Sequence, residues 1–439
     1  MKIAVLGLWH QGVVAAACLA DMGLEVVGAD PDLQRIADLQ KGRAPLFEPG
    51  LDALLEKGVA GGRLTFTADV VDAVRDVPYV FVMFDTPVNE MDESDLSGIF
   101  QAFEQIAPAI ADDAVILVTA QVPVGTCDRL IGIVNTRKTS APASIAYIPE
   151  NLRLGQAIER FRAPALPVIG CDDKRTFDRL LTILGSTAAG WQHVTLRTGE
   201  MVKHALNAFL ALNICFANEL GNLCDEVGAD GKRVGEVLRM EPRIGSKAML
   251  LPGLGFSGGT LARDMQTLRS LGRKLDIPTP LLDGAWQSNI EQNRLVVRKL
   301  SRALQKLSGA RIAVLGLTYK PNTSTLRRSA ALDVIAELIG VGAVVAAHDP
   351  KADAAEVKAV STCTVCADPL AALEGADALV LMTPWTDYKD LDFEAAKRVM
   401  AGTYVLDTAG LWDGRQVSMA GLIYDEIGRG RRKHRPRAC

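Results

Sequence analysis

A seven-residue motif that occurs twice constrains the fold of this 439-residue chain more than any other feature. The motif reads KIAVLGL at residues 2–8 and RIAVLGL at residues 311–317. Each copy is followed by a helical stretch and then by a strand that ends in an acid, at Asp30 and at Asp349. A strand, a glycine turn, a helix and a second strand with an acidic end form the mononucleotide-binding βαβ unit. The repeat therefore predicts two nucleotide-binding halves of similar fold.

Other short apolar runs alternate with helical segments in both halves. YVFVMF (79–84) and AVILVT (114–119) lie in the first half, and ALVLMT (378–383) and TYVLDT (403–408) lie in the second. This alternation is typical of parallel sheets. Residues 197–300 lose the strand pattern and predict long helices with a wide apolar face, which suits a buried spine or a dimer interface. The expected fold is α/β, with two Rossmann-like doubly wound parallel-sheet domains joined by a central helical domain.

Composition narrows the class of protein. The formal net charge is −4, from 48 basic and 52 acidic residues, and it gives no reason to expect a nucleic-acid partner. Eight cysteines lack the density of a disulfide scaffold and favour a reduced cytoplasmic compartment. No stretch reaches the roughly 18 uncharged apolar residues of a membrane helix, so we expect a soluble protein without a membrane partner. Cys363 and Cys366 have metal-ligand spacing, but no second pair accompanies them, and we expect no metal site.

The first glycine turn predicts a dinucleotide cofactor. Gly7 and Gly12 fit the pattern G-x-G-x-x-G, whereas Trp9 occupies the middle position, where glycine lets the backbone approach a pyrophosphate. Asp30 stands where an acid accepts hydrogen bonds from the adenosine ribose. Its charge would repel a 2′-phosphate. The sequence therefore predicts NAD rather than NADP.

Separated motifs from residue 1 to about residue 428 resemble the UDP-glucose/GDP-mannose dehydrogenases, which oxidise the C6 hydroxymethyl of a nucleotide-bound sugar to a carboxylate with two NAD. The motifs that carry the resemblance are LFEPGLDALL (46–55), DTP (85–87), VPVGT (122–126), PENLRLG (149–155), EMVKHALNAFLA (200–211), EPRIGSKAMLLPGLGFSGGTLARD (241–264) and YKPNTSTLRRS (319–329).

This resemblance implies a role for each part of the chain. Residues 1–196 would bind NAD, residues 197–300 would form a homodimer, and residues 301–428 would bind the nucleotide of a UDP-sugar. We expect the basic segment 429–439, RGRRKHRPRAC, to be disordered. A cytoplasmic enzyme of polysaccharide biosynthesis is implied.

Catalytic residues are carried over motif by motif. Lys203 and Asn207 are four residues apart, so a helix places both on one face, where an ammonium and an amide can donate to a developing oxyanion. The alternative for this pair is a solvated helix face, which the apolar flanks disfavour. By resemblance, Asp264 is a partner of the lysine and of a catalytic water, Glu150 is the first glutamate of PENLRLG, and Arg243 reaches the sugar across the dimer interface.

Cofactor and substrate contacts follow from the same motifs. The expected cofactor-binding residues are Gly7, Trp9, Gly12, Asp30, Arg35, Thr86 and Gln121, and the expected substrate-binding residues are Arg243, Gly255, Gly258, Lys320 and Arg327.

Several positions depart from the family pattern. Thr260 stands where the family has its nucleophilic cysteine, and Leu154 stands where the family has the glutamate that assists thioester hydrolysis. A threonine hydroxyl is a far weaker nucleophile than a thiol near neutral pH, and no histidine in its segment could activate it. Further departures are Gln121 for threonine, Arg263 for lysine, Thr325 for aspartate, and DTAG (407–410) for D-G-R-N.

Three functions remain open. The first is an NAD-dependent nucleotide-sugar dehydrogenase with Lys203, Asn207, Asp264, Glu150 and Thr260 at its site, which transfers hydride without a thioester. The second is a full four-electron 6-dehydrogenase that acts through an aldehyde hydrate. The third is a non-catalytic nucleotide-sugar-binding paralogue, against which the retained catalytic set argues.

Overall fold

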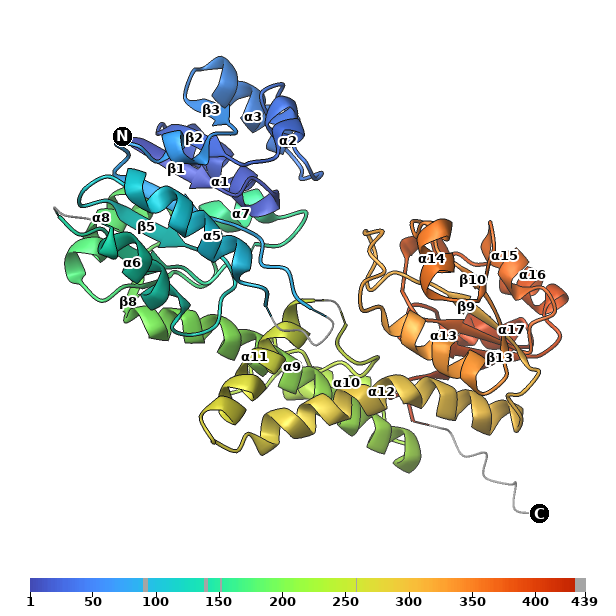
Figure 1. Cartoon of the computed structure of the whole chain (residues 1–439). Helices are drawn as coiled ribbons and strands as arrows, with labels where there is room; N and C mark the ends of the chain where they lie inside the picture. The colour runs from blue at the N-terminus through green and yellow to red at the C-terminus, as the bar shows by residue number, and fades with distance from the viewer. Residues whose placement is uncertain (90–93, 138–140, 151, 258, 431–439) are drawn as a thin grey trace, which may run out of the picture. The chain divides into compact units, whose positions relative to one another are not determined.

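The computed structural model describes residues 1–89, 94–137, 141–150, 152–257 and 259–430 (Figure 1). The chain divides into two compact units, the first from Met1 to Leu206 and the second beginning at Asn207. Among the residues just named, no helix is long and apolar enough to cross a membrane.

The first unit contains an eight-stranded sheet of strand order β3-β2-β1-β4-β5-β6-β7-β8. The strands are β1 (Lys2–Leu6), β2 (Glu25–Ala29), β3 (Leu64–Thr67), β4 (Tyr79–Val82), β5 (Val115–Val118), β6 (Ser144–Tyr147), β7 (Val168–Gly170) and β8 (Gln192–Val194). Neighbouring strands are parallel except β6 and β7, which meet antiparallel at Tyr147 and Gly170. The chain order reverses between β1 and β4, and ligands of such sheets bind beyond the carboxyl ends of the strands at this point.

Helices cover both faces of this sheet (Figure 1). They are α1 (His10–Asp21), α2 (Leu33–Leu39), α3 (Leu51–Ala60), α4 (Val70–Ala73), α5 (Ser97–Ile106), α6 (Thr126–Thr136), α7 (Ala157–Arg162) and α8 (Lys174–Leu184), with single turns η1 (Ala107–Ala109) and η2 (Gly185–Thr187). One hydrophobic core joins the sheet to α1, α3 and α8, and another joins it to α4, α5 and α6. Because both faces are covered, every residue of β4 and β5 is buried, which explains their continuous apolar sequence.

Four helices occupy most of the segment for which the sequence predicted helices. They are α9 (Leu196–Val227), α10 (Gly231–Leu238), α11 (Thr260–Lys274) and α12 (Pro280–Leu304). Ala208, Cys215 and Met265 belong to a small core that α9, α11 and α12 share. The predicted boundary between residues 300 and 301 falls inside α12. The division into three domains stays a prediction.

The second sheet has six strands in the order β11-β10-β9-β12-β13-β14. They are β9 (Arg311–Leu315), β10 (Val344–His348), β11 (Thr364–Val365), β12 (Ala378–Leu381), β13 (Tyr404–Asp407) and β14 (Ile423–Glu426), and all their pairings are parallel. Its helices are α13 (Ala330–Gly340), α14 (Ala354–Val360), α15 (Pro369–Leu373), α16 (Phe393–Val399) and α17 (Gly414–Met419), with the single turn η3 (Thr386–Tyr388). The predicted fold, two parallel-sheet domains and a helical segment, is confirmed.

The sequence repeat is also a repeat of detailed structure. Gly7 and Gly316 end the two copies of the strand with φ of +86° and +91°, which favours glycine at both turns. Asp30 follows β2 and accepts the Leu8 backbone N–H at 2.8 Å. Asp349 follows β10 and accepts the Leu317 backbone N–H at 2.7 Å. In each half an acid therefore fixes the turn beyond the first strand.

Candidate active site

The turn after β1 is closed tightly enough to require its two glycines. A Cβ at Gly7 would lie 2.8 Å from the Phe84 side chain, and a Cβ at Gly12 would lie 1.9 Å from the Gly7 carbonyl oxygen. Helix α1 begins at His10, and the residue before it, Trp9, provides no side-chain cap. The N–H groups of the first helical turn are therefore left to bind an anion such as a pyrophosphate. These residues fit a dinucleotide.

Trp9 and Arg35 lie together beside this turn. The Trp9 side chain is 39% exposed, and the Arg35 guanidinium carbon lies 5.2 Å from the centre of its ring. Arg35 Nη1 is also 2.7 Å from Asp30 Oδ2. Asp30 is 4% exposed and accepts the backbone N–H of Asp32 at 3.0 Å. Three residues assigned separately to the cofactor thus form one cluster, in which Arg35 balances the charge of Asp30.

A glutamate without an assigned role ties the cofactor turn to the PENLRLG loop. Glu48 is 4% exposed, and its Oε2 lies 3.0 Å from His10 Nε2. The same carboxylate accepts the backbone N–H groups of Gly155 and Ala157, each at 2.8 Å. The sequence offered one signal, a glutamate inside the motif LFEPGLDALL. Two of its partners, Gly155 and Ala157, lie more than 100 residues further along the chain, so a local pattern could not reveal them.

Lys203 and Glu150 are brought together in the first unit. Lys203 is 3% exposed on α9, and its Nζ donates to the Glu150 backbone carbonyl oxygen. The ammonium is also 3.9 Å from Glu150 Oε2. The Glu150 carboxylate accepts the Leu152 backbone N–H. The lysine is therefore a buried cation beside a carboxylate, and the alternative of a solvated helix face is wrong.

Two neighbours of Lys203 on α9 hold the loop that follows β5. Glu200, with no exposed surface, accepts the Gly125 N–H at 2.6 Å and the Cys127 N–H at 2.9 Å. Burial raises the pKa of this carboxyl above its usual value. His204 Nε2 lies 2.9 Å from the Val122 carbonyl oxygen. Helix α9 thus holds the loop after β5 through one residue before Lys203 and one residue after it.

Thr86 and Gln121, which the sequence assigned to the cofactor, follow the carboxyl ends of the neighbouring strands β4 and β5. The Thr86 hydroxyl donates to the Gln121 carbonyl oxygen at 2.9 Å. Both residues are buried. The Gln121 amide Nε2 has no hydrogen-bond partner in the part of the chain that the structure describes.

In the second unit, Asn207 and Asp264 form a buried pair. The Asn207 amide donates to Asp264 Oδ2, and their exposures are 5% and 0%. Thr260 is the first residue of α11 and is exposed, and Asp264 follows one helical turn later. Lys203 and Asn207 are separated by one turn of α9 and share a helix face.

The described cysteines do not replace Thr260 as an accessible nucleophile. Cys18, Cys127, Cys171, Cys215, Cys224 and Cys363 are buried, and Cys366 is partly buried. Cys215 lies in the core shared by α9 and α11, where its thiol donates to the Ala285 carbonyl oxygen at 3.2 Å. Burial raises the pKa of this thiol to about 12, so it stays protonated at neutral pH.

A cavity of about 250 Å³ lies beyond the carboxyl ends of β9, β12 and β13. Residues Ser329, Ala330 and Ala331, where α13 begins, contribute to its wall. Gly255 and Lys320 line the cavity, as expected of substrate-binding residues. Arg327 is exposed and is not among the lining residues. Gly258 lies outside the described residues.

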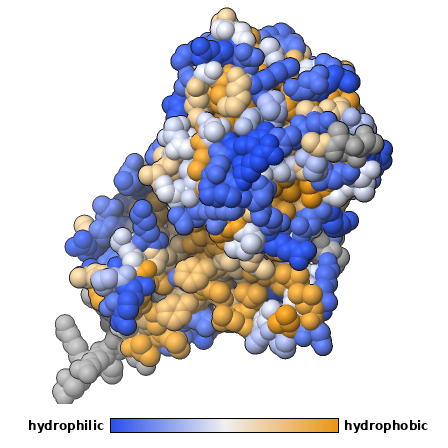
Figure 2. Space-filling model, turned by 90° about the vertical axis from the view of Figure 1, so that its left-hand side faces the viewer, coloured by the Kyte–Doolittle hydropathy of each residue, from blue (hydrophilic) through white to orange (hydrophobic). Residues whose placement is uncertain are grey.

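The central helices expose an apolar stripe. Phe209, Phe216, Leu223 and Val227 on α9 are each more than half exposed. Figure 2 shows that hydrophobic side chains also form a broad area on the face that it displays. Arg243 has a side chain that is 88% exposed and forms an ion pair with the nearby Glu241 at 2.8 Å.

The chain matches three models of one family along most of its length. They are the UDP-glucose/GDP-mannose dehydrogenase family NAD binding domain at residues 1–185, the central domain at residues 197–291 and the UDP binding domain at residues 313–414.

Relatives and solved structures give the same result. UDP-glucose 6-dehydrogenase of Rhizobium meliloti (strain 1021) is 36% identical over 98% of this chain and 100% of its own length, and TuaD of Bacillus subtilis (strain 168) is 33% identical over 98% and 93%. A UDP-glucose dehydrogenase from Pyrobaculum islandicum superposes with a TM-score of 0.87 at 31% identity, covering 98% of both chains. The protein therefore belongs to the UDP-glucose/GDP-mannose dehydrogenase family, and it is an NAD-dependent oxidoreductase that acts on a nucleotide sugar.

Proposed function

We propose that this protein oxidises an alcohol of a UDP-sugar by hydride transfer and that the reaction forms no covalent thioester. NAD, when bound, supplies the hydride acceptor. The observation that carries the proposal is the retained, buried polar set on α9 and α11 combined with a threonine at the position of the nucleophile. Lys203, Asn207 and Asp264 are each at least 95% buried, a state that a solvated helix surface does not produce.

Lys203 and Asn207 are the oxyanion donors in this proposal. As the sugar alcohol loses hydride and a proton, its oxygen passes through a state of increased negative charge. A fixed ammonium and amide that donate to this oxygen stabilise the transition state more than the ground state. Asp264, which Asn207 orients, receives the alcohol proton through a water molecule.

The cofactor is held by the turn after β1. The N–H groups at the start of α1 bind the pyrophosphate, and the Asp30 and Arg35 cluster binds the adenosine ribose. Trp9 takes the place of the glycine at which the backbone would approach the pyrophosphate. Thr86 and Gln121, at the ends of β4 and β5, contact the nicotinamide half.

The nucleotide of the substrate occupies the cavity beside Lys320. A cavity at the strand ends and at the start of α13 offers backbone N–H donors and a lysine for a diphosphate. The matching UDP binding domain and the relatives named as UDP-glucose dehydrogenases support UDP as the nucleotide.

The absence of a thioester follows from two side chains. Thr260 presents a hydroxyl, whose proton is held far more tightly than that of a thiol. Leu154 is 52% exposed and has no group that can activate water. Cys215, the thiol in the core beside α11, is buried and protonated. The residues that support oxidation of the alcohol to an aldehyde are therefore retained. The residues that usually support oxidation of that aldehyde are not.

A homodimer is part of the proposal. The apolar stripe on α9, formed by Phe209, Phe216, Leu223 and Val227, would be covered by a second copy of the chain. Arg243, whose side chain is 88% exposed, would then reach the sugar site of the partner.

A four-electron oxidation through the aldehyde hydrate is the second candidate. Glu150 favours it, because this carboxylate beside Lys203 could accept a proton from a hydrated aldehyde.

A panel of UDP-, GDP- and ADP-sugars with NAD, analysed by mass spectrometry of the products, tests the substrate class. We expect an oxidised UDP-sugar. If every nucleotide sugar left NAD unreduced, the activity proposed here would be wrong, and a binding-only paralogue would be supported.

A further inference from the structure

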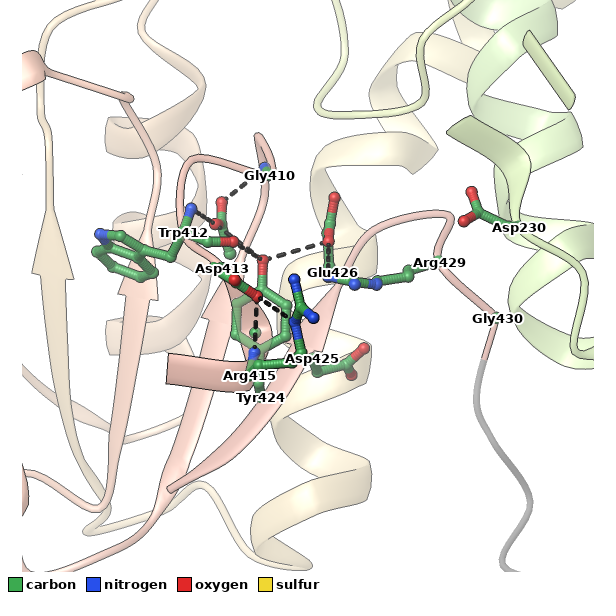
Figure 3. A network of polar contacts seen from close by, with 12 residues as sticks. Asp230, Gly410, Trp412, Asp413, Arg415, Tyr424, Asp425, Glu426, Arg429 and Gly430 are labelled. Atoms are coloured by element: carbon green, nitrogen blue, oxygen red, sulfur yellow. Dashed lines mark hydrogen bonds and ion pairs between the residues drawn. The ribbon is translucent and has the colours of Figure 1, made fainter. Parts of the chain in front are cut away.

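The end of the second sheet connects to the first residues of the basic segment through one ion pair (Figure 3). Arg429 Nη1 lies 2.9 Å from Glu426 Oε2, and the guanidinium carbon lies 5.7 Å from the centre of the Tyr424 ring. The backbone N–H of Gly430 donates to Asp225 at 3.1 Å. The sequence assigned Arg429 to a disordered tail. The structure gives this residue a defined place against β14, and residues 431–439 lie outside the described chain.

Tyr424 places one hydroxyl between two carboxylates. Its oxygen lies 3.1 Å from Asp407 Oδ2, 3.2 Å from Glu426 Oε2 and 3.2 Å from the Trp412 carbonyl oxygen. A single hydroxyl hydrogen can satisfy only one of these three acceptors. Asp407 and Glu426 are both more than 90% buried, so their charges need compensation. Arg429 supplies a positive charge at Glu426.

Asp407 shapes the loop that follows β13. Its carboxylate accepts the backbone N–H groups of Ala409 at 3.0 Å, Gly410 at 2.8 Å and Trp412 at 2.9 Å. Gly410 has a φ of +67°, and a Cβ at this position would lie 2.4 Å from Glu426 Oε1. Glu426 therefore packs directly against the loop and also contacts it through Tyr424.

The same loop forms part of the nucleotide cavity. Thr408 and Ala409 line the cavity of about 250 Å³ together with Lys320. We propose that Glu426, held by Arg429, is a positioning residue for this cavity: the pair fixes loop 407–412 through Tyr424, Asp407 and Gly410. The inference rests on the proposed binding of UDP in this cavity. It adds that Arg429, at the start of the basic segment, helps to hold the wall of the cavity in place.

Other charged groups surround the pair. Lys232 of α10 approaches the same glycine, with its Nζ 3.4 Å from the Gly410 Cβ position. Asp230 and Asp413 lie within electrostatic reach of Arg429. Without Arg429, the buried carboxylates of Glu426 and Asp407 would lie on either side of the Tyr424 hydroxyl. Lys232 would remain as a nearby cation. The repulsion between these two carboxylates would then push the loop apart, and replacing Glu426 with glutamine would remove it.

The inference predicts a loss of UDP affinity when the charge of Arg429 is removed. Arg429→Gln leaves the buried carboxylate of Glu426 beside Asp407 without its cation, so the loop is disturbed. In the full-length protein, we expect Arg429→Gln to weaken UDP binding by about tenfold. Arg429→Lys should bind UDP nearly as the unmodified protein does, and the double variant Glu426→Gln/Arg429→Gln should recover part of the affinity that Arg429→Gln loses. Arg415→Gln is the matched control, because Arg415 pairs with Asp413 in the same region and is 88% exposed.

Calorimetric titration with UDP measures these affinities, and hydrogen exchange of the peptide covering residues 407–412 measures the opening of the loop. Faster exchange in Arg429→Gln, reversed in the double variant, is expected. Equal UDP affinity in Arg429→Gln and the unmodified protein, or unchanged loop exchange, would overturn the inference while leaving the proposed function intact. Failure of the unmodified protein to bind UDP would contradict both.

A second comparison tests the inference if Arg429→Gln does not fold. Because Arg429 acts through Glu426, the variants Glu426→Gln and Glu426→Gln/Arg429→Gln should bind UDP equally well. A further loss of affinity in the double variant would assign Arg429 a separate role and overturn the inference.

Discussion

At the scale of single residues, the candidate site contains two kinds of side chain. The spacing of residues in the sequence predicted some of them and gave no sign of the others. The spacing of Lys203 and Asn207 predicted a shared helix face, and α9 confirms the helix. The contact between Lys203 and Glu150 joins residues 53 positions apart. Glu48, which ties the cofactor turn to a distant loop, was missed for the same reason. Contacts of this kind arise from tertiary packing, which no local pattern encodes.

Replacing Lys203 tests its assignment as an oxyanion donor. Lys203→Ala should lower the rate of hydride transfer by about a hundredfold to a thousandfold, as removal of one oxyanion donor does. Lys174→Ala is the control, because Lys174 is exposed on α8 and its contacts with Asp178 and the Phe177 ring are local to that helix. Steady-state NADH formation and circular dichroism measure rate and folding. An unchanged rate in folded Lys203→Ala would assign this lysine to structure.

Trp9 provides a test at the cofactor turn. Trp9→Gly should tighten NAD binding by about threefold to tenfold, equivalent to one recovered hydrogen bond between backbone and pyrophosphate. We expect NAD to bind more tightly than NADP in both proteins, because we assign Asp30 to the adenosine ribose. Fluorescence titration measures both cofactors. Tighter binding of NADP would show that the pairing of Asp30 with Arg35 has removed the discrimination expected from the acid.

Restoring the thiol tests the missing covalent step. Thr260→Cys should produce an enzyme–sugar adduct that mass spectrometry detects, and the adduct should hydrolyse slowly because Leu154 is unchanged. Adding Leu154→Glu should release more of the acid product. If Thr260→Cys formed no adduct with a substrate that the unmodified protein oxidises, the alignment of Thr260 with the nucleophile would be in doubt.

At the scale of elements, helix α9 carries Lys203 and also holds a neighbouring loop through Glu200 and His204. Both side chains hold the loop after β5, and they flank Lys203 on the same helix. The apolar length of this segment predicted a long helix. Its side-chain contacts with the loop could not be predicted, because the sequence does not show which surface loop a helix meets.

The raised pKa of Glu200 gives this support a pH dependence. A carboxyl with a higher pKa in the folded state stabilises the fold most below its unfolded pKa, and it loses that contribution as pH rises through the folded value. The stability of the unmodified protein relative to Glu200→Gln should therefore decrease as pH rises from below 4.5, the usual pKa of a glutamate, towards neutrality. Thermal unfolding of both proteins across this range measures the difference. A difference that increased with pH would contradict the assignment.

At the scale of the whole molecule, the sequence repeat predicted both sheets, because parallel strands covered on two faces leave a strong apolar pattern. The two acids that close the turns, Asp30 and Asp349, were also placed correctly. The network around Glu426 was not foreseen, since it joins β14, the loop after β13 and the start of the basic segment through contacts of buried charges. The sequence resembled a family and departed from it at Thr260 and Leu154, and these departures bear on how many electrons the whole enzyme removes.

The number of NADH formed per sugar tests the central proposal most directly. Hydride transfer from an alcohol requires an acceptor, a base and a stabilised oxygen, whereas the second oxidation normally requires the thiol to whose position we assign Thr260. The assay uses the unmodified protein, a limiting amount of the UDP-sugar that it accepts and excess NAD, with absorbance for NADH and hydroxylamine to trap a carbonyl product. We predict about one NADH per sugar, a trapped aldehyde or ketone and no covalent adduct. Two NADH per sugar with a carboxylate product would contradict this account and support oxidation of the aldehyde hydrate.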